Sequence, residues 1–156
     1  MCGMIIRSFW VQTASAMPLL PIAAMAALLS SLTLERQPRF LLFLKAFIGG
    51  AIGPGIIVST DALVEKAALL HKVEYIKPEH AICTNTKDSI QSGIINGYVG
   101  FVENIVRQME KELSAPPTVV ATGGMSSMIA AETDSIDVLH PTLTLEGLNY
   151  IYLMNQ

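Results

Sequence analysis

Residues Thr86 to Leu113 read TKDSIQSGIINGYVGFVENIVRQMEKEL, and this stretch decides the fold. Its apolar side chains recur at three- and four-residue spacing, which is the period of one helical face. The residues in this pattern are Ile90, Ile94, Tyr98, Val102, Ile105 and Met109. The spacing therefore predicts one long helix that begins near Thr86, ends near Leu113 and buries one side in a domain.

The segments after this helix alternate between strand and helix patterns. Thr118 to Ala121 is a short run typical of a buried strand, and it ends in the turn Thr122-Gly123-Gly124. We expect a short helix at Met125 to Ala131 and a last helix from about Thr144 to Met154. Because strands alternate with helices, the pattern predicts an α/β layer architecture.

The segments before the long helix have weaker signals. Phe47 to Val58 (FIGGAIGPGIIV) predicts a strand, a tight turn and then a strand or extended chain. Ser59 or Thr60 is expected to cap a helix that runs to about His71. Val73 to Ile76 is expected to form a short strand.

Composition excludes several classes of protein. The 156 residues are 51% hydrophobic and 15% charged, which is too apolar for a disordered chain. Ten basic against thirteen acidic residues give a net charge of −3, so we expect no nucleic-acid partner. The two cysteines, Cys2 and Cys83, cannot build a disulfide framework or a four-cysteine zinc site, which favours a reducing compartment.

The hydrophobic residues are unevenly distributed. No charged residue occurs from Ser8 to Leu34, and Met17 to Leu32 is an apolar helix candidate. Its length is marginal for a bilayer span of about 20 residues, and Pro18 and Pro21 interrupt it. A signal peptide fits no better, because the stretch after Arg7 is long and polar. A membrane-anchored binding protein that uses Met17 to Leu32 is therefore one alternative.

Two short motifs could contact a ligand. Thr122-Gly123-Gly124 is either a plain strand-to-helix turn or a place where backbone approaches a ligand. Asn85-Thr86 either caps the long helix or offers a hydroxyl to a carboxylate ligand at the helix N-terminus.

Small residues form a stripe on the long helix. Ser89, Gly93, Gly97 and Gly100 share one side, and each glycine lowers helix propensity by about 1 kcal/mol. We expect this stripe to allow close approach of another helix or chain, across a subunit interface, in preference to a ligand contact.

The remaining polar candidates favour structural interpretations. His71, His80 and His140 do not cluster, so we expect surface histidines and no metal site. Cys83 is expected to be a small buried hydrophobe. Asp61 and Glu65 could bind a cation, but charge near a helix N-terminus explains both.

Four segments together resemble the C-terminal half of a type III pantothenate kinase. They are GGAIGPG (Gly49 to Gly55), NTKDSIQSGIINGYVG (Asn85 to Gly100), VVATGG (Val119 to Gly124) and LTLEGL (Leu143 to Leu148). The resemblance implies one half of a ribonuclease-H-like fold, as in the actin, Hsp70 and sugar kinase superfamily. It also implies phosphorylation of pantothenate by ATP, the first step of coenzyme A synthesis, with Mg²⁺ and a monovalent cation (K⁺ or NH₄⁺).

The resemblance also assigns roles to particular residues. Thr86 would contact pantothenate, and Gly123 and Gly124 would lie beside the adenosine of ATP. The helix from Thr86 to Leu113 would form a homodimer, and the enzyme would be cytoplasmic, without a membrane partner. The family's DxGNT-type phosphate loop, its GxDR-type catalytic aspartate and its DFGTATTF segment with the cation-binding aspartate do not occur in this chain. We therefore expect no catalytic residue here and little or no kinase activity.

A shift of reading frame explains the missing DFGTATTF segment. If the third base of each codon joins the first two bases of the next, Leu32 to Phe40 (LTLERQPRF) can be re-read as DFGTATTF. We interpret residues 1–46 as carrying an out-of-frame segment without a reliable fold, and residues 47–156 as the ATPase-like α/β domain of a truncated kinase. A non-catalytic regulator on the same fold is the other alternative.

Overall fold

The computed structural model describes residues 4–6, 39–44, 46–67, 70–113 and 117–156. The apolar candidate at Met17 to Leu32 and most of the segment re-read as DFGTATTF lie outside these residues. No helix in the described part of the chain is both long enough and apolar enough to cross a bilayer.

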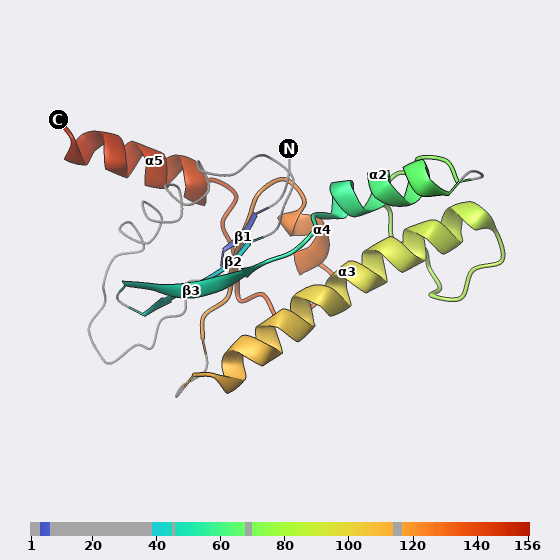
Figure 1. The fold of residues 1–156 in the computed structure, drawn as a ribbon, viewed down its shortest axis with the longest axis horizontal. Coiled ribbons are helices and arrows are strands. Elements are labelled where there is room, and N and C mark those ends of the chain that lie inside the picture. Colours follow the sequence, from blue (N-terminus) through green and yellow to red (C-terminus); the bar gives the residue numbers. More distant parts are fainter. Residues whose placement is uncertain (1–3, 7–38, 45, 68–69, 114–116) are drawn as a thin grey trace.

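The described residues form a mixed α/β structure, as the alternating sequence pattern predicts (Figure 1). In chain order the elements are β1 Met4–Ile6, β2 Arg39–Leu44, β3 Ala46–Ile52, α2 Ile56–Lys66, α3 Thr86–Lys111, β4 Val120–Thr122, α4 Ser126–Ala130, β5 Val138–Leu139 and α5 Leu143–Met154.

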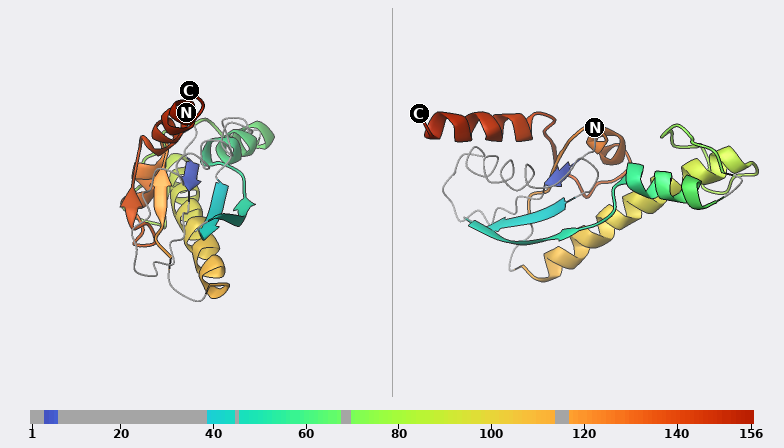
Figure 2. Two further views of the ribbon diagram at one scale, coloured as in Figure 1. Left: turned by 90° about the vertical axis from the view of Figure 1, so that its left-hand side faces the viewer. Right: turned by 45° about the horizontal axis from the view of Figure 1, so that its top comes forward.

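The strands form two separate sheets. One has the order β1-β4-β5, in which β4 pairs antiparallel with β1 and parallel with β5. The other is the antiparallel hairpin of β2 and β3, whose register shifts between Leu42 and Phe43. Two views of the ribbon show α3 running beside both sheets, so this one helix connects the parts of the fold (Figure 2).

The core lies where α3 meets β4, α4 and the start of α2. Its buried side chains are Ile56, Ile95, Val102, Val106, Val119 and Ile129. The helix predicted from the apolar spacing of α3 is confirmed, but the side chains that it buries differ in part from the predicted ones. Ile95 and Val106 are buried although the predicted face omits them, whereas Ile94, Tyr98, Ile105 and Met109 are only partly buried.

The turn between β3 and α2 lies close to α3 at Gly53. A Cβ atom at this glycine would lie 2.4 Å from Cζ of Phe101, closer than atoms can approach. A side chain at position 53 would therefore push Phe101 out of its place against the core.

The predicted start, cap and end of α2 are wrong. The helix begins at Ile56, inside the segment expected to be extended, and its N-cap is Gly55 without a side-chain hydrogen bond. Thr60 does not cap it, because its hydroxyl donates to the Ile56 carbonyl one turn back, at 2.7 Å. The helix ends at Lys66, earlier than the predicted His71.

The strand predicted at Val73 to Ile76 is also wrong, since these residues form no regular element. The side-chain amide of Gln91 on α3 donates a hydrogen bond to the Glu74 carbonyl at 2.8 Å. This backbone carbonyl therefore has a helix side chain, and not a neighbouring strand, as its hydrogen-bond partner.

The elements after α3 agree with the predictions, with one omission. β4, α4 and α5 lie within one or two residues of the expected bounds. The two-residue strand β5 was not predicted. The carboxylate of Asp137, just before β5, accepts a hydrogen bond from the Val119 backbone at 2.6 Å, and the backbone N–H groups of Asp137 and Val138 donate to the Val119 carbonyl.

We predict that Ile95→Ala lowers the free energy of unfolding by about 2–5 kcal/mol, because Ile95 is fully buried in the core and truncation leaves a cavity. Urea denaturation measures this loss. Ile82→Ala is the control, since Ile82 is 91% exposed and should change stability by less than about 0.5 kcal/mol. Equal effects of the two substitutions would contradict the assigned core.

Candidate functional site

A cavity of about 820 Å³ lies between α2 and the N-terminal half of α3. Apolar side chains of both helices form most of its wall, including Ile56, Leu63, Ile94 and Phe101. Most of its polar groups lie near the N-terminus of α3 and come from Cys83, Thr84, Asn85, Thr86 and Ser89, while Ser59 lines it from the first turn of α2. A concave, mostly apolar site with a few convergent polar groups is typical of small-molecule binding.

Asn85 caps the N-terminus of α3, as its structural interpretation predicts. Its side-chain oxygen accepts a hydrogen bond from the Asp88 N–H at 2.9 Å, and its amide donates to the Asp88 carboxylate at 2.7 Å. The Ser89 hydroxyl donates to the Asn85 carbonyl at 2.7 Å. Thr86 is the first residue of the helix, is exposed and lines the cavity. The structure therefore gives the cap to Asn85 and leaves Thr86 facing the cavity.

The small-residue stripe of α3 lies partly inside this cavity. Gly93 and Gly97 line it, and a Cβ atom at Gly93, Gly97 or Gly100 would meet no atom of the described structure within 4 Å. Across the cavity the stripe faces α2, without contact at the position of a Cβ atom. Close approach of another chain to this stripe stays a prediction.

The loop that precedes α3 is held in place by buried side chains of the helix. Besides Gln91, Ser92 donates from its hydroxyl to the Ala81 carbonyl at 2.8 Å, and Asn96 donates to the Ser92 hydroxyl at 3.0 Å. These bonds fix the chain two residues before Cys83, where it enters the cavity wall.

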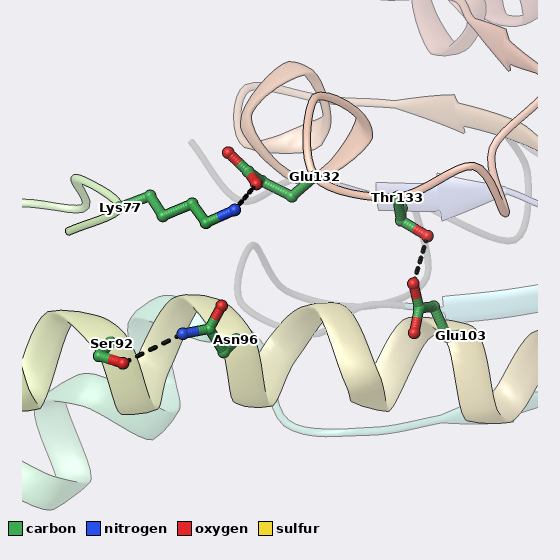
Figure 3. A network of polar contacts seen from close by, with 6 residues as sticks. All are labelled: Lys77, Ser92, Asn96, Glu103, Glu132 and Thr133. Carbon is green, nitrogen blue, oxygen red and sulfur yellow. Dashed lines mark hydrogen bonds and ion pairs between the residues drawn. The ribbon is translucent and has the colours of Figure 1, made fainter. Parts of the chain in front are cut away.

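Polar contacts also tie this loop and the middle of α3 to the end of α4 (Figure 3). Lys77 of the loop forms an ion pair with Glu132, which lies two residues after the end of α4. The neighbouring Thr133 donates from its hydroxyl to the Glu103 carboxylate of α3 at 2.7 Å. The loop and α3 are thus both fastened to the α4 segment, which holds the polar end of the cavity in position.

The turn Thr122-Gly123-Gly124 lies at a different place, at the end of β4. Gly123 has φ of 101°, a conformation that favours glycine, and its carbonyl accepts from the Ser126 hydroxyl at 2.5 Å. The buried Thr122 hydroxyl donates to the Pro141 carbonyl at 3.2 Å, which fastens the turn to the start of α5. Gly123 and Gly124 do not line the cavity, so the structure does not bring them together with Thr86.

The histidine predictions are confirmed for two residues and corrected for the third. His71 and His80 are exposed. His140 is half-buried, its Nδ1 atom is buried without a hydrogen-bond partner, and its Nε2 atom lies 3.6 Å from the Glu146 carboxylate. The short β5–α5 connection that holds His140 was not recognised in the sequence, which is why the burial was missed.

The prediction that Cys83 is a small buried hydrophobe is wrong. Its side chain is half-buried, lines the cavity and donates from Sγ to the His80 carbonyl at 3.1 Å. Its position two residues before the Asn85 cap is the one signal in the sequence that could have placed it at this site.

The carboxylates do not gather into a cation site. Asp61 pairs with Lys72 at 2.8 Å, and Glu65 lies 3.7 Å from Lys66. Within the described ranges no group of three His, Cys, Asp or Glu side chains is close enough to hold a metal ion.

Known proteins match most of the chain. Residues 41–108 match the family model of type III pantothenate kinase. Type III pantothenate kinases from Roseiflexus castenholzii and from a Geobacillus species are 53% identical over 110 residues and 49% identical over 111 residues. These matches cover 70% and 71% of this chain but 43% of each relative, so the chain spans less than half the length of the relatives it matches.

A solved structure has a similar fold. The crystal structure described as a Baf family transcriptional activator from Campylobacter jejuni matches with a TM-score of 0.55 and 16% identity, covering 92% of this chain and 67% of that one. This likeness shows the mixed α/β fold alone. The sequence matches go further, because over about 70% of its length the chain is similar to type III pantothenate kinases.

Proposed function

We propose that the chain carries one half of a type III pantothenate kinase, the enzyme that transfers the γ-phosphoryl group of ATP to pantothenate at the start of coenzyme A synthesis. Identities of 49–53% to proteins of that name support the proposal. The proposed fold is the C-terminal half of a ribonuclease-H-like fold of the actin, Hsp70 and sugar kinase superfamily. The chemistry uses ATP and pantothenate, so the proposal places the enzyme in the cytoplasm.

The cavity at the N-terminus of α3 is the observation that carries this proposal. Pantothenate has a carboxylate at one end and an apolar dimethyl group near the other. The cavity offers a mostly apolar wall with polar groups at one end, and its volume of about 820 Å³ is ample for such a molecule. We assign Thr86 to the pantothenate contact, because it begins α3, where the helix dipole favours an anion or a polar ligand.

We propose that the glycine turn after β4 lies beside the adenosine of ATP. Gly123 and Gly124 carry no side chains, so a flat ring can approach the backbone closely. The buried Thr122 supports this assignment, since its bond to the Pro141 carbonyl holds the turn rigidly. The separation of this turn from the cavity fits a site in which the two substrates enter from different sides.

The residues present do not fit the metal and phosphate part of the family's chemistry. The chain lacks the DxGNT-type loop, the GxDR-type segment and the DFGTATTF segment. Phosphoryl transfer depends on a phosphate cradle, positioned metal and a base. We therefore assign neither Mg²⁺ nor a monovalent cation to any residue here and derive no transfer step.

The frame-shift hypothesis accounts for that loss. It divides the chain into residues 1–46, with the out-of-frame segment, and residues 47–156, with the kinase-like domain. The family match begins at residue 41, just after Leu32 to Phe40 and six residues before this boundary. The coding DNA tests it: in the shifted frame, the codons for Leu32 to Phe40 should spell DFGTATTF, and any other reading would remove the hypothesis.

The long helix is the proposed dimer contact. The open strip along Gly93, Gly97 and Gly100 supports this proposal, because glycines leave room for a second backbone to approach α3. A homodimer through the helix from Thr86 to Leu113 would cover the cavity on its open side.

The first prediction is that the purified chain does not phosphorylate pantothenate. Incubation with ATP, Mg²⁺, K⁺ and pantothenate should yield no product above the level without protein, because the phosphate loop and both aspartates are missing. The Roseiflexus castenholzii relative, assayed in parallel, is the positive control. Turnover at the relative's rate would overturn the assignment of this chain as an inactive half.

The second prediction concerns Thr86. Thr86→Val should weaken pantothenate binding at least about tenfold, because a lost hydrogen bond to a charged ligand is worth about 1.5–3 kcal/mol. Saturation-transfer NMR with the full chain measures this binding. Ser127→Ala, which removes an exposed hydroxyl from α4, is the control and should leave binding unchanged. Equal binding by the Thr86 variant would remove its role, and no binding by the unaltered chain would remove the cavity assignment.

The third prediction concerns the glycine strip. Gly97→Leu should convert a dimer to a monomer in size-exclusion chromatography with light scattering, without unfolding α3, because the new side chain meets no atom of its own chain within 4 Å at Cβ. Asn96→Leu places the same side chain about a quarter-turn around the helix and should keep the dimer. A dimer that survives Gly97→Leu would exclude this strip as the contact.

A further inference from the structure

The segment that follows α4 makes polar contacts with two other elements. Glu132 forms an ion pair with Lys77 of the loop between α2 and α3, and the Thr133 hydroxyl donates to the Glu103 carboxylate of α3 at 2.7 Å. Figure 3 shows these side chains pointing toward one another from different parts of the chain. Since α4 begins soon after the glycine turn at the end of β4, this segment joins that turn to the loop that lines the cavity.

Glu132 has the most shielded carboxylate among the ion pairs between described residues. Its side chain is 22% exposed, whereas the side chains of Asp61 and Glu65 in the pairs on α2 are 33% and 75% exposed. An interaction between charges weakens as water surrounds them, so a shielded pair keeps its geometry better than an exposed one. The Lys77–Glu132 pair adds little to the stability of the fold, but it determines where Lys77 lies relative to α4.

Hydrogen bonds and core packing connect Glu132 to the glycine turn. The Gly123 carbonyl accepts from both the N–H and the hydroxyl of Ser126, at 3.1 and 2.5 Å. Ile129 of α4 is 1% exposed and belongs to the core. The Glu132 N–H donates to the Ile129 carbonyl at 3.0 Å. Because close-packed segments transmit displacement, a ligand that restrains the turn also restrains Glu132.

Lys77 extends this restraint to the polar end of the cavity. It lies on a stretch without helix or strand, six residues before Cys83, which lines the cavity. The hydrogen bond from Ser92 to the Ala81 carbonyl holds the same stretch from α3. The pair with Glu132 holds it from the α4 segment. The position of the cavity loop therefore depends on the α4 segment as well as on α3.

The second contact of the α4 segment lies far from the polar end of the cavity. Thr133 bonds to Glu103, which follows Thr86 by 17 residues on the same helix. This separation is about 25 Å along α3. Of the two contacts, the Lys77 pair is therefore the one that acts on the residues around Thr86, and the Thr133 hydrogen bond provides a matched control.

We propose that the Lys77–Glu132 ion pair couples the glycine turn to the cavity, so that an adenosine group at the turn raises the affinity of the cavity for pantothenate. This inference rests on the proposed function, which assigns the two ligands to these places. A ligand that restrains Glu132 also restrains Lys77, so the cavity loop loses less conformational entropy when pantothenate binds. Neither residue lines the cavity or belongs to the turn, so both are positioning residues. By linkage, pantothenate raises the affinity for adenosine by the same factor.

Titrations with and without the second ligand test this coupling. The full chain is titrated with pantothenate, and NMR measures the dissociation constant in the absence and in the presence of saturating adenosine. We expect adenosine to lower this constant at least about fivefold, the lower end of typical coupling between two sites. Hydrogen exchange gives a second readout, because adenosine alone should slow the exchange of backbone amides in residues 77–85.

Substitutions in the ion pair identify the contact that carries the coupling. Lys77→Met should abolish the effect of adenosine, and the exchange of charges in Lys77→Glu with Glu132→Lys should restore it. Thr133→Val removes the other contact of the same segment and should keep the effect. A merely structural role of Lys77 would weaken pantothenate binding equally with and without adenosine, whereas the proposed role changes the ratio of the two constants. Circular dichroism checks that each variant folds.

The outcomes separate this proposal from the proposed function. If both ligands bind but adenosine leaves the pantothenate constant unchanged, the coupling is excluded and the substrate assignments stand. The full effect in Lys77→Met, no recovery in the charge-exchange variant, or loss of the effect in Thr133→Val would each also exclude the ion pair as the link. If the unaltered chain binds no pantothenate or no adenosine, the substrate assignments themselves are wrong, and the coupling is excluded with them.

Discussion

The burial of one side of α3 is the constraint on which the rest of the structure depends. Ile95, Val102 and Val106 belong to the buried core cluster, to which α3 contributes more side chains than any other described element. Because a helix has a fixed period, burying this side sets the direction of every other side chain on α3. The glycine strip must then face away from the core, and the Asn85 cap must lie at the mouth of the cavity. The packing of the core therefore determines where the residues of the candidate site lie.

Polar contacts outside the core hold the loop before α3 in place. In the loop between α2 and α3 the described residues 70–85 form no helix or strand, yet several of them form part of the cavity wall. Hydrogen bonds from the side chains of Gln91 and Ser92, together with the Lys77–Glu132 ion pair, hold the loop where a strand would be held by backbone hydrogen bonds. A surface ion pair is worth little energy alone, so the buried Gln91 and Ser92 carry most of this task.

The sequence allowed some elements to be predicted for clear physical reasons. α3 has 26 residues, so its apolar period repeats often enough to be read, and β4 is a short apolar run closed by two glycines. Other elements depend on contacts that no local pattern encodes. β5 is two residues long and is held by the hydrogen bond between the Asp137 carboxylate and the Val119 backbone, while α2 starts at Ile56 after Gly55, an N-cap without a side chain. The same holds at the site: the residue types of Thr86 and Gly123 were recognised, but their separation in space is a property of the tertiary fold.

The described residues keep their exposed apolar side chains mainly in two places, near the α2–α3 cavity and on β5 and α5, while the core between them is well covered. An exposed apolar surface of this kind is typical of contact with another surface. The proposed function accounts for both places, because one lobe of a two-lobed, dimeric kinase would have each of them covered.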